Sequence, residues 1–95
     1  MEMKQVKIYQ LPTKHYALFR DYEFMVENGV QLAEYNIVWE GEVEDDAELD
    51  DIYTKFNLFR PSNFGGRSLS VSDIVEMDGT YYFCDDFGWK EVYKD

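Results

Sequence analysis

The chain has 95 residues, of which 20 are acidic and nine basic, and its formal net charge is −11. A charge of this sign argues against direct binding to nucleic acid and to anionic membrane surfaces, because both are negatively charged themselves. Seventeen aromatic residues and a lone cysteine predict one folded domain over residues 1–95 in the reducing cytoplasm, without a disulfide or a zinc site made of several cysteines.

The first third of the chain predicts a strand and then a helix. Residues 6–11 alternate between polar and apolar side chains, as a half-buried strand does, and Pro12 closes the segment. Residues 15–28 predict a helix, and Gly29 is a suitable residue just beyond its end. The side chains that recur on one face of this helix are Phe19, Tyr22 and Val26, with Leu18 and Met25 beside them.

Residues 35–43 alternate more strictly and predict a second strand. Its odd positions are of core type: Tyr35, Ile37, Trp39, Gly41 and Val43. Its even positions end in three carboxylates, Glu40, Glu42 and Glu44. Because side chains alternate along a strand, these three should project from one face at intervals of about 6.6 Å. That interval is of the same order as the spacing of charges along a nucleic-acid strand.

Residues 46–57 predict a second helix, with Asp45 as its N-cap and Glu48 three residues later in a capping box. Its apolar residues follow helical spacing: Leu49, Ile52, Tyr53 and Phe56. Acids in a first turn are favoured by the helix dipole, which accounts for much of the presence of Asp45, Asp46 and Glu48. The dipole does not account for the three glutamates of the preceding strand.

The second half of the chain predicts a loop over residues 59–67 and then a hairpin around Asp78-Gly79. The hairpin strands should span residues 69–77 and 80–85. A two-residue turn pairs residue 74 with 83 and residue 75 with 82, and both faces of the hairpin are partly apolar, so we expect it inside the sheet. Residues 87–92 predict a last short strand.

These elements predict an α+β fold. We expect a small, mostly antiparallel sheet of three to five strands, with the C-terminal hairpin at its centre and two helices packed on it.

The negative charge is concentrated in one stretch. Residues 21–54 carry twelve acids and no Lys or Arg, whereas the rest of the chain carries eight acids and nine bases. Runs of this kind are usually disordered tails or solvated faces, but this one alternates with core-type residues and predicts a folded acidic face. The expected partner-binding residues are Glu34, Glu40, Glu42, Glu44, Asp45, Asp46, Glu48, Asp50 and Asp51.

A metal site and a catalytic site are both weakly supported. Asp46, Glu48 and Asp50 have the spacing that begins a calcium loop, but the sixth and twelfth positions are Asp51 and Asn57 instead of Gly and Glu. His15 and Cys84 have no identifiable orienting partner, and a cysteine in an apolar strand is usually a small core residue. We expect no metal, no cofactor and no catalytic residue.

Several segments resemble a known family. Residues 56–75 (FNLFRPSNFGGRSLSVSDIV), 8–11 (IYQL), 81–82 (YY) and 86–92 (DFGWKEV) resemble the YodL-like domain over about two thirds of the chain. That domain occurs in proteins carried on conjugative elements and phages of Gram-positive bacteria, so the resemblance implies an accessory protein of a mobile element. Residues 84–86 depart from the family pattern, and the family brings no established activity.

Charge and resemblance together suggest two functions. The first is an inhibitor of a host nucleic-acid-targeting defence enzyme, either an anti-CRISPR protein acting on a Cas effector such as Cas9 or an antirestriction protein. In this reading the acidic face mimics DNA or RNA and occupies a basic surface of the nuclease. The alternative is a YodL-like protein–protein interaction module with another role in mobile-element maintenance, in which the acids are only a solvated surface. An enzyme is a third and weaker possibility.

Chelation provides a test of the expected absence of metal. EDTA should leave the melting temperature of the purified protein unchanged, because no credible set of metal ligands can be found. A decrease of several degrees would contradict this expectation.

Overall fold

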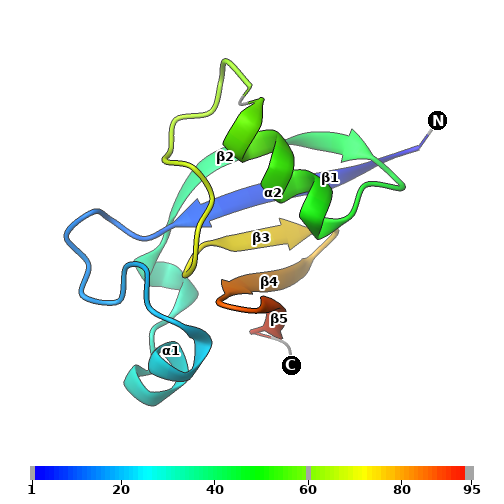
Figure 1. Ribbon diagram of the computed structural model, residues 1–95. Helices are drawn as coiled ribbons and strands as arrows, with labels where there is room; N and C mark the ends of the chain where they lie inside the picture. The colour runs from blue at the N-terminus through cyan, green and yellow to red at the C-terminus, as the bar shows by residue number, and fades with distance from the viewer. Residues whose placement is uncertain (1, 60, 94–95) are drawn as a thin grey trace.

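The computed structural model describes residues 2–59 and 61–93, which form an α+β fold with a five-stranded sheet (Figure 1). In chain order the elements are β1 (Met3–Gln10), α1 (Tyr22–Asn28), a 3-10 helix (Leu32–Glu34), β2 (Asn36–Glu44), α2 (Leu49–Leu58), β3 (Ile74–Met77), β4 (Thr80–Asp85) and β5 (Gly88–Val92). The strand order is β2-β1-β3-β4-β5, and each neighbouring pair is antiparallel. The predicted fold class is confirmed.

The β3–β4 hairpin lies inside the sheet, as predicted. Asp78 and Gly79 have φ values of 50° and 87°, the positive values that a type I′ turn requires at both central positions. The turn sets the predicted register, with Ile74 opposite Phe83. The strand before the turn is shorter than expected: it begins at residue 74 and not at 69.

Each face of the sheet carries its own hydrophobic core. The core under α2 is built from Val6, Ile8, Trp39, Val43, Ile52, Phe56, Leu69 and Val75. The core on the opposite face is built around α1 from Tyr9, Leu11, Ala17, Met25, Val30, Tyr35, Ile74 and Phe83. Figure 1 shows α2 crossing the sheet, whereas α1 lies at one end of it. Much of the face opposite α2 therefore has no helix on it.

Helix α1 is shorter than predicted and buries a different face. Residues 15–20 form turns instead, with Arg20 N donating to the carbonyl of Ala17, and the helix begins after Asp21, whose side chain caps Phe24 N. Phe19 has a φ of 66° and donates its amide to Ser72 Oγ, so it cannot continue a helix. Phe19 and Val26 of the predicted apolar face are exposed, which corrects that part of the prediction, whereas Tyr22 packs on the core and its neighbour Met25 is the buried helical residue.

Helix α2 begins later than predicted. Its N-cap is Glu48 and not Asp45, and the capping box pairs Glu48 with Asp51. The reason lies in the sheet, because Asp45 N donates to the carbonyl of Glu2 and so continues the pairing with the first strand. The predicted buried residues Ile52 and Phe56 do pack on the sheet, while Tyr53 is partly exposed.

Strand β2 contains a bulge that the alternation of the sequence does not reveal. Trp39 lies opposite Ile8 and Ile37 opposite Tyr9, which leaves Val38 without a partner position. The bulge moves Ile37 to the other face, where it is 53% exposed, and turns Val38 toward the α2 core. Ile37 is therefore a wrong prediction of a core residue, whereas Trp39 and Val43 are buried as expected.

The glycine at position 41 makes room for the indole of Trp39. A methyl group at Gly41 would lie 2.6 Å from Trp39 Cζ2, whereas one at Gly65 would have Val38 O as its nearest neighbour at 3.9 Å. Gly41→Ala should lower the free energy of unfolding by about 1–3 kcal/mol, because the ring must leave its packing on Phe56. Gly65→Ala is the matched control and should change it by less than about 0.5 kcal/mol in urea denaturation.

Candidate protein interface

The three glutamates of β2 lie on the face of the sheet opposite α2. Glu40, Glu42 and Glu44 are exposed, and they alternate with Trp39 and Val43, which pack under the helix. Across the strand pair they lie opposite Lys7, Gln5 and Met3 of β1. Helix α1 and its core occupy the other end of this face. We call Glu40, Glu42 and Glu44 the open-face acids.

A fourth carboxylate joins this face from β3. Glu76 lies opposite Lys7, and its Oε1 accepts a hydrogen bond of 2.7 Å from the hydroxyl of Tyr9. Lys7 Nζ lies 3.6 Å from Glu40 Oε1 and offsets part of the charge. Burial and the neighbouring Glu76 carboxylate raise the pKa of the Tyr9 hydroxyl, which therefore stays a hydrogen-bond donor at neutral pH. Sequence reasoning missed Glu76, because a local pattern does not show that β3 pairs with β1.

The other predicted acids lie on the α2 side of the sheet. They are Asp45 and Asp46 in the turn after β2, and Glu48, Asp50 and Asp51 at the start of the helix; we call these five the helix-start acids. Two of them form the capping box, in which Glu48 N donates to Asp51 Oδ2 at 2.9 Å. Asp50 Oδ1 accepts a bond of 3.3 Å from the indole of Trp89. The predicted partner-binding acids therefore do not share one face of the sheet. The open-face acids and the helix-start acids lie on opposite sides of the edge formed by β2.

Glu34 is separate from both groups. It sits in the 3-10 helix before β2, where its carboxylate accepts from Gln31 N at 2.7 Å and contacts His15 Nε2 at 2.9 Å. The Gln31 amide, followed by His15, lowers the pKa of Glu34. These bonds give Glu34 a local structural role.

A hollow of about 350 Å³ lies where the two acid groups meet. Its apolar lining residues are Met3, Val43, Ala47 and Ile52. Its charged lining residues are Glu42, Glu44, Asp51 and Lys55. Because it joins the β2 edge to the flank of α2, the hollow can receive an apolar side chain or the aliphatic stem of a basic one.

A buried polar network holds the loop that precedes β3. Gln10 Nε2 donates to Arg67 O at 2.9 Å and to Asp73 Oδ2 at 3.0 Å, and Ser70 N donates to the same oxygen of Asp73. The other oxygen of Asp73 has no hydrogen-bond partner among the described residues. Burial of this carboxylate raises the pKa of Asp73 to about 7, against the opposing effect of its Ser70 and Gln10 hydrogen bonds.

A family model of the YodL-like domain matches residues 5–94. The chain belongs to this family. The match covers β2 to β5 and all of β1 except its first two residues, and it includes the Gln10–Asp73 network. No curated protein and no solved structure matches the chain.

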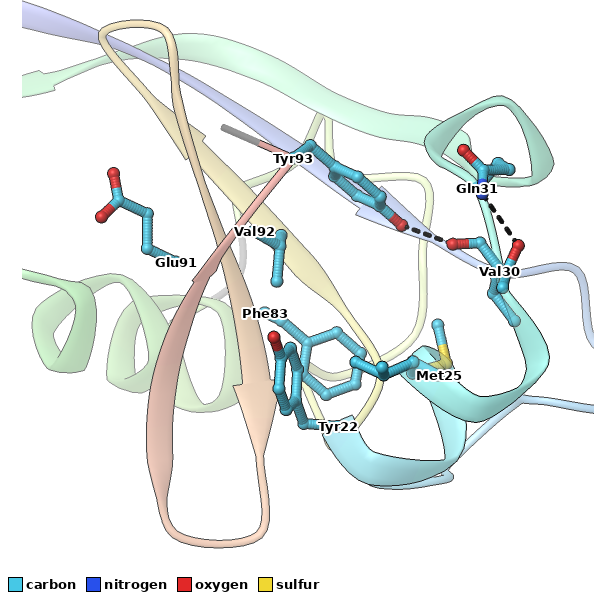
Figure 2. Close-up of a pocket in the computed structure, with 10 residues that line it drawn as sticks. Tyr22, Met25, Val30, Gln31, Phe83, Glu91, Val92 and Tyr93 are labelled. Atoms are coloured by element: carbon cyan, nitrogen blue, oxygen red, sulfur yellow. Dashed lines mark hydrogen bonds between the residues drawn. The ribbon is translucent and has the colours of Figure 1, made fainter. Parts of the chain in front are cut away.

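This YodL-like domain also has an apolar pocket of about 350 Å³ beside α1 (Figure 2). Tyr22, Phe83 and Val92 line it from α1, β4 and β5, and the hydroxyl of Tyr93 donates to Val30 O at 3.0 Å across its end. Figure 2 shows Glu91 pointing away from these side chains, on the other side of β5. The pocket shares no lining residue with the open-face acids, whose strand β2 forms the opposite edge of the sheet from β5.

The two residues considered for nucleophilic chemistry are engaged elsewhere in this YodL-like domain. Cys84 is buried in β4, and burial raises the pKa of its thiol to about 12, so the thiolate is scarce at neutral pH. His15 Nδ1 accepts from Ala17 N, which leaves Nε2 to carry the proton toward Glu34.

Across residues 2–59 and 61–93, no group of three or more His, Cys, Asp or Glu side chains is arranged to hold a metal ion. In the same part of the chain, no helix combines the length and the apolar character needed to cross a membrane.

The buried carboxylate of Asp73 predicts a pH-dependent stability. Because the pKa of Asp73 is near 7 in the folded chain and 3.8 for an unperturbed aspartate, the folded state binds the extra proton between these values, and stability falls as the pH rises through them. Asp73→Asn keeps an oxygen for Ser70 N and Gln10 Nε2 but cannot ionise. Its stability relative to the parent should rise by about 2–3 kcal/mol between pH 5 and pH 8 in urea denaturation. If the difference in stability between Asp73→Asn and the parent is the same at pH 5 and pH 8, the carboxyl group of Asp73 does not ionise with a raised pKa.

Proposed function

We propose that this YodL-like domain inhibits a host defence enzyme that targets nucleic acid, by placing its acidic surface in the enzyme's basic channel. The observation that carries the proposal is the row of open-face acids on a part of the sheet that neither helix covers. Channels that hold a nucleic-acid duplex in Cas9-type nucleases are positively charged and contact the phosphate backbone without reading sequence. A regular row of carboxylates suits such a surface.

The distribution of charge supports a partner that is basic over a wide area. Glu76 extends the row of open-face acids onto β3, and the helix-start acids continue the negative surface around the β2 edge. Complementary charge of this extent steers encounter and excludes acidic competitors, including nucleic acid itself. Membership in the YodL-like family adds the context in which such an inhibitor is useful, since the resemblance described above points to mobile elements.

The proposed role is binding and not catalysis. Cys84 is buried and protonated, and His15 is held by Ala17 N and Glu34. The proposal needs no cofactor, and it places the protein in the cytoplasm, where restriction and Cas nucleases act on their substrates.

Reversal of the open-face acids tests the proposal. The triple variant Glu40→Lys, Glu42→Lys and Glu44→Lys should fold normally, because exposed substitutions usually change stability by less than about 0.5 kcal/mol each. Its inhibition of the target nuclease should be about 10- to 100-fold weaker, with a flatter dependence on salt, because each exposed pair contributes up to about 1 kcal/mol and is screened by ions. The measurement is DNA cleavage by a panel of purified Cas and restriction nucleases, titrated with parent and variant.

A matched control carries the same change of charge elsewhere. The triple variant Glu23→Lys, Glu27→Lys and Asp86→Lys reverses the charge of three exposed acids that do not belong to the open-face acids. This variant should inhibit the nuclease as well as the parent does. Equal inhibition by both triple variants would show that the open-face acids are only a solvated surface. If the parent inhibits no nuclease of the panel, the proposal fails, and affinity capture from host lysate then tests the alternative role as a module of mobile-element maintenance.

A further inference from the structure

Strand β2 forms one edge of the sheet, and its pairing with β1 shows which backbone groups face outward. Asp45 N donates to Glu2 O, so the odd-numbered residues of this part of β2 direct their amides and carbonyls toward β1. On the other side of β1, Asp78 N donates to Gln5 O. The backbone groups of the odd-numbered residues of β1 therefore point toward β3, and those of the even-numbered residues point toward β2. The even residues of β2 therefore face away from the sheet.

The outward-facing backbone groups of β2 form hydrogen bonds at both ends of a short stretch, but those between the two ends do not. Val38 O accepts from Gly65 N of the long loop, and Glu44 O accepts from Ala47 N of the turn before α2. Between these two bonds, the amides of Glu40, Glu42 and Glu44 and the carbonyls of Glu40 and Glu42 have no hydrogen-bond partner within residues 2–59 and 61–93. This leaves three donors and two acceptors in a row on an extended backbone.

We propose that this edge binds an extended, basic segment of the partner protein as a sixth strand of the sheet. The open-face acids project from the same three residues whose amides are open, so a paired strand would place every second side chain beside a carboxylate, where Lys or Arg fits. The alternate side chains of the added strand would face the hollow lined by Val43, Ala47 and Ile52, and apolar side chains suit this lining. The inference rests on the proposed function only in taking the partner to be basic.

Charge decides between a basic segment and a second copy of this chain. Two β2 edges paired with each other would bring two rows of glutamates onto neighbouring strands, and like charges on paired strands are destabilising. Charged edge residues are a common means by which proteins prevent pairing between copies. The same acids that exclude a second copy attract a strand with alternate Lys or Arg.

A proline substitution with a charge-matched control tests strand addition. Glu42→Pro removes one outward amide and one charge, whereas Glu42→Gln removes the same charge and keeps the amide. Proline is tolerated in an edge strand where its nitrogen faces solvent, and the melting temperature of both variants reports on folding. The probe is the blocked peptide Thr-Lys-Val-Lys-Val-Lys-Thr, with affinity measured by calorimetry. Glu42→Pro should bind this peptide about 10-fold more weakly than Glu42→Gln.

Hydrogen exchange on the parent protein provides a test that does not depend on how a variant folds. With the peptide bound, the amides of Glu40, Glu42 and Glu44 should exchange more slowly, while those of Trp39, Gly41 and Val43 are already protected by β1. No gain of protection at the three outward amides, no binding of the peptide at millimolar concentration, or equal affinities of Glu42→Pro and Glu42→Gln would each overturn the inference.

The two proposals fail in different ways. If the triple lysine variant loses nuclease inhibition and the parent shows no protection at the outward amides, the acidic surface binds by charge alone and only strand addition is wrong. If the outward amides are protected by the peptide but the parent inhibits no nuclease of the panel, strand addition holds and the proposed function is wrong.

Discussion

The structure depends on the position of β1 between β2 and β3. Residues 6–9 of β1 pair with β2 on one side and with β3 on the other, and the side chains of successive residues supply opposite faces of the sheet. Val6 and Ile8 supply the core under α2, and Tyr9 supplies the core beside α1. Lys7 lies between Val6 and Ile8 in sequence and on the opposite face from them, where it meets Glu40 and Glu76.

This arrangement explains how a small chain tolerates so many acids. The open-face acids and the helix-start acids surround one edge of the sheet, where water solvates them and where capping bonds give several of them a second role. Repulsion among them is limited by screening, because exposed charges interact weakly in ordinary buffer. Asp73 is the contrast, since its carboxylate is fully buried and, among the residues that the structure describes, only one of its oxygens has a hydrogen-bond partner.

Local sequence signals were sufficient where a single physical rule governs an element. The hairpin register follows from Asp78-Gly79 because both residues accept positive φ, and the turn then leaves only one way to pair the strands. Local sequence signals gave wrong element boundaries where tertiary hydrogen bonds engage the same residues. The N-cap of α2 moved from Asp45 to Glu48 because Asp45 N is bonded to β1, and the start of α1 moved because the amide of Phe19 is bonded to Ser72.

The sequence by itself determined that the chain forms an α+β domain, that its charge lies in one stretch, and that Glu40, Glu42 and Glu44 share a face, because each of these follows from composition or from strand alternation. Only the tertiary structure decided that this face is opposite α2 and is covered by α1 at one end alone, that Glu76 joins it, and that the helix-start acids lie on the other side of the edge. It also decided that β2 is an edge strand with outward amides. Strand order depends on contacts between residues far apart in the chain, such as Lys7 with Glu76, and no local pattern encodes which strands become neighbours.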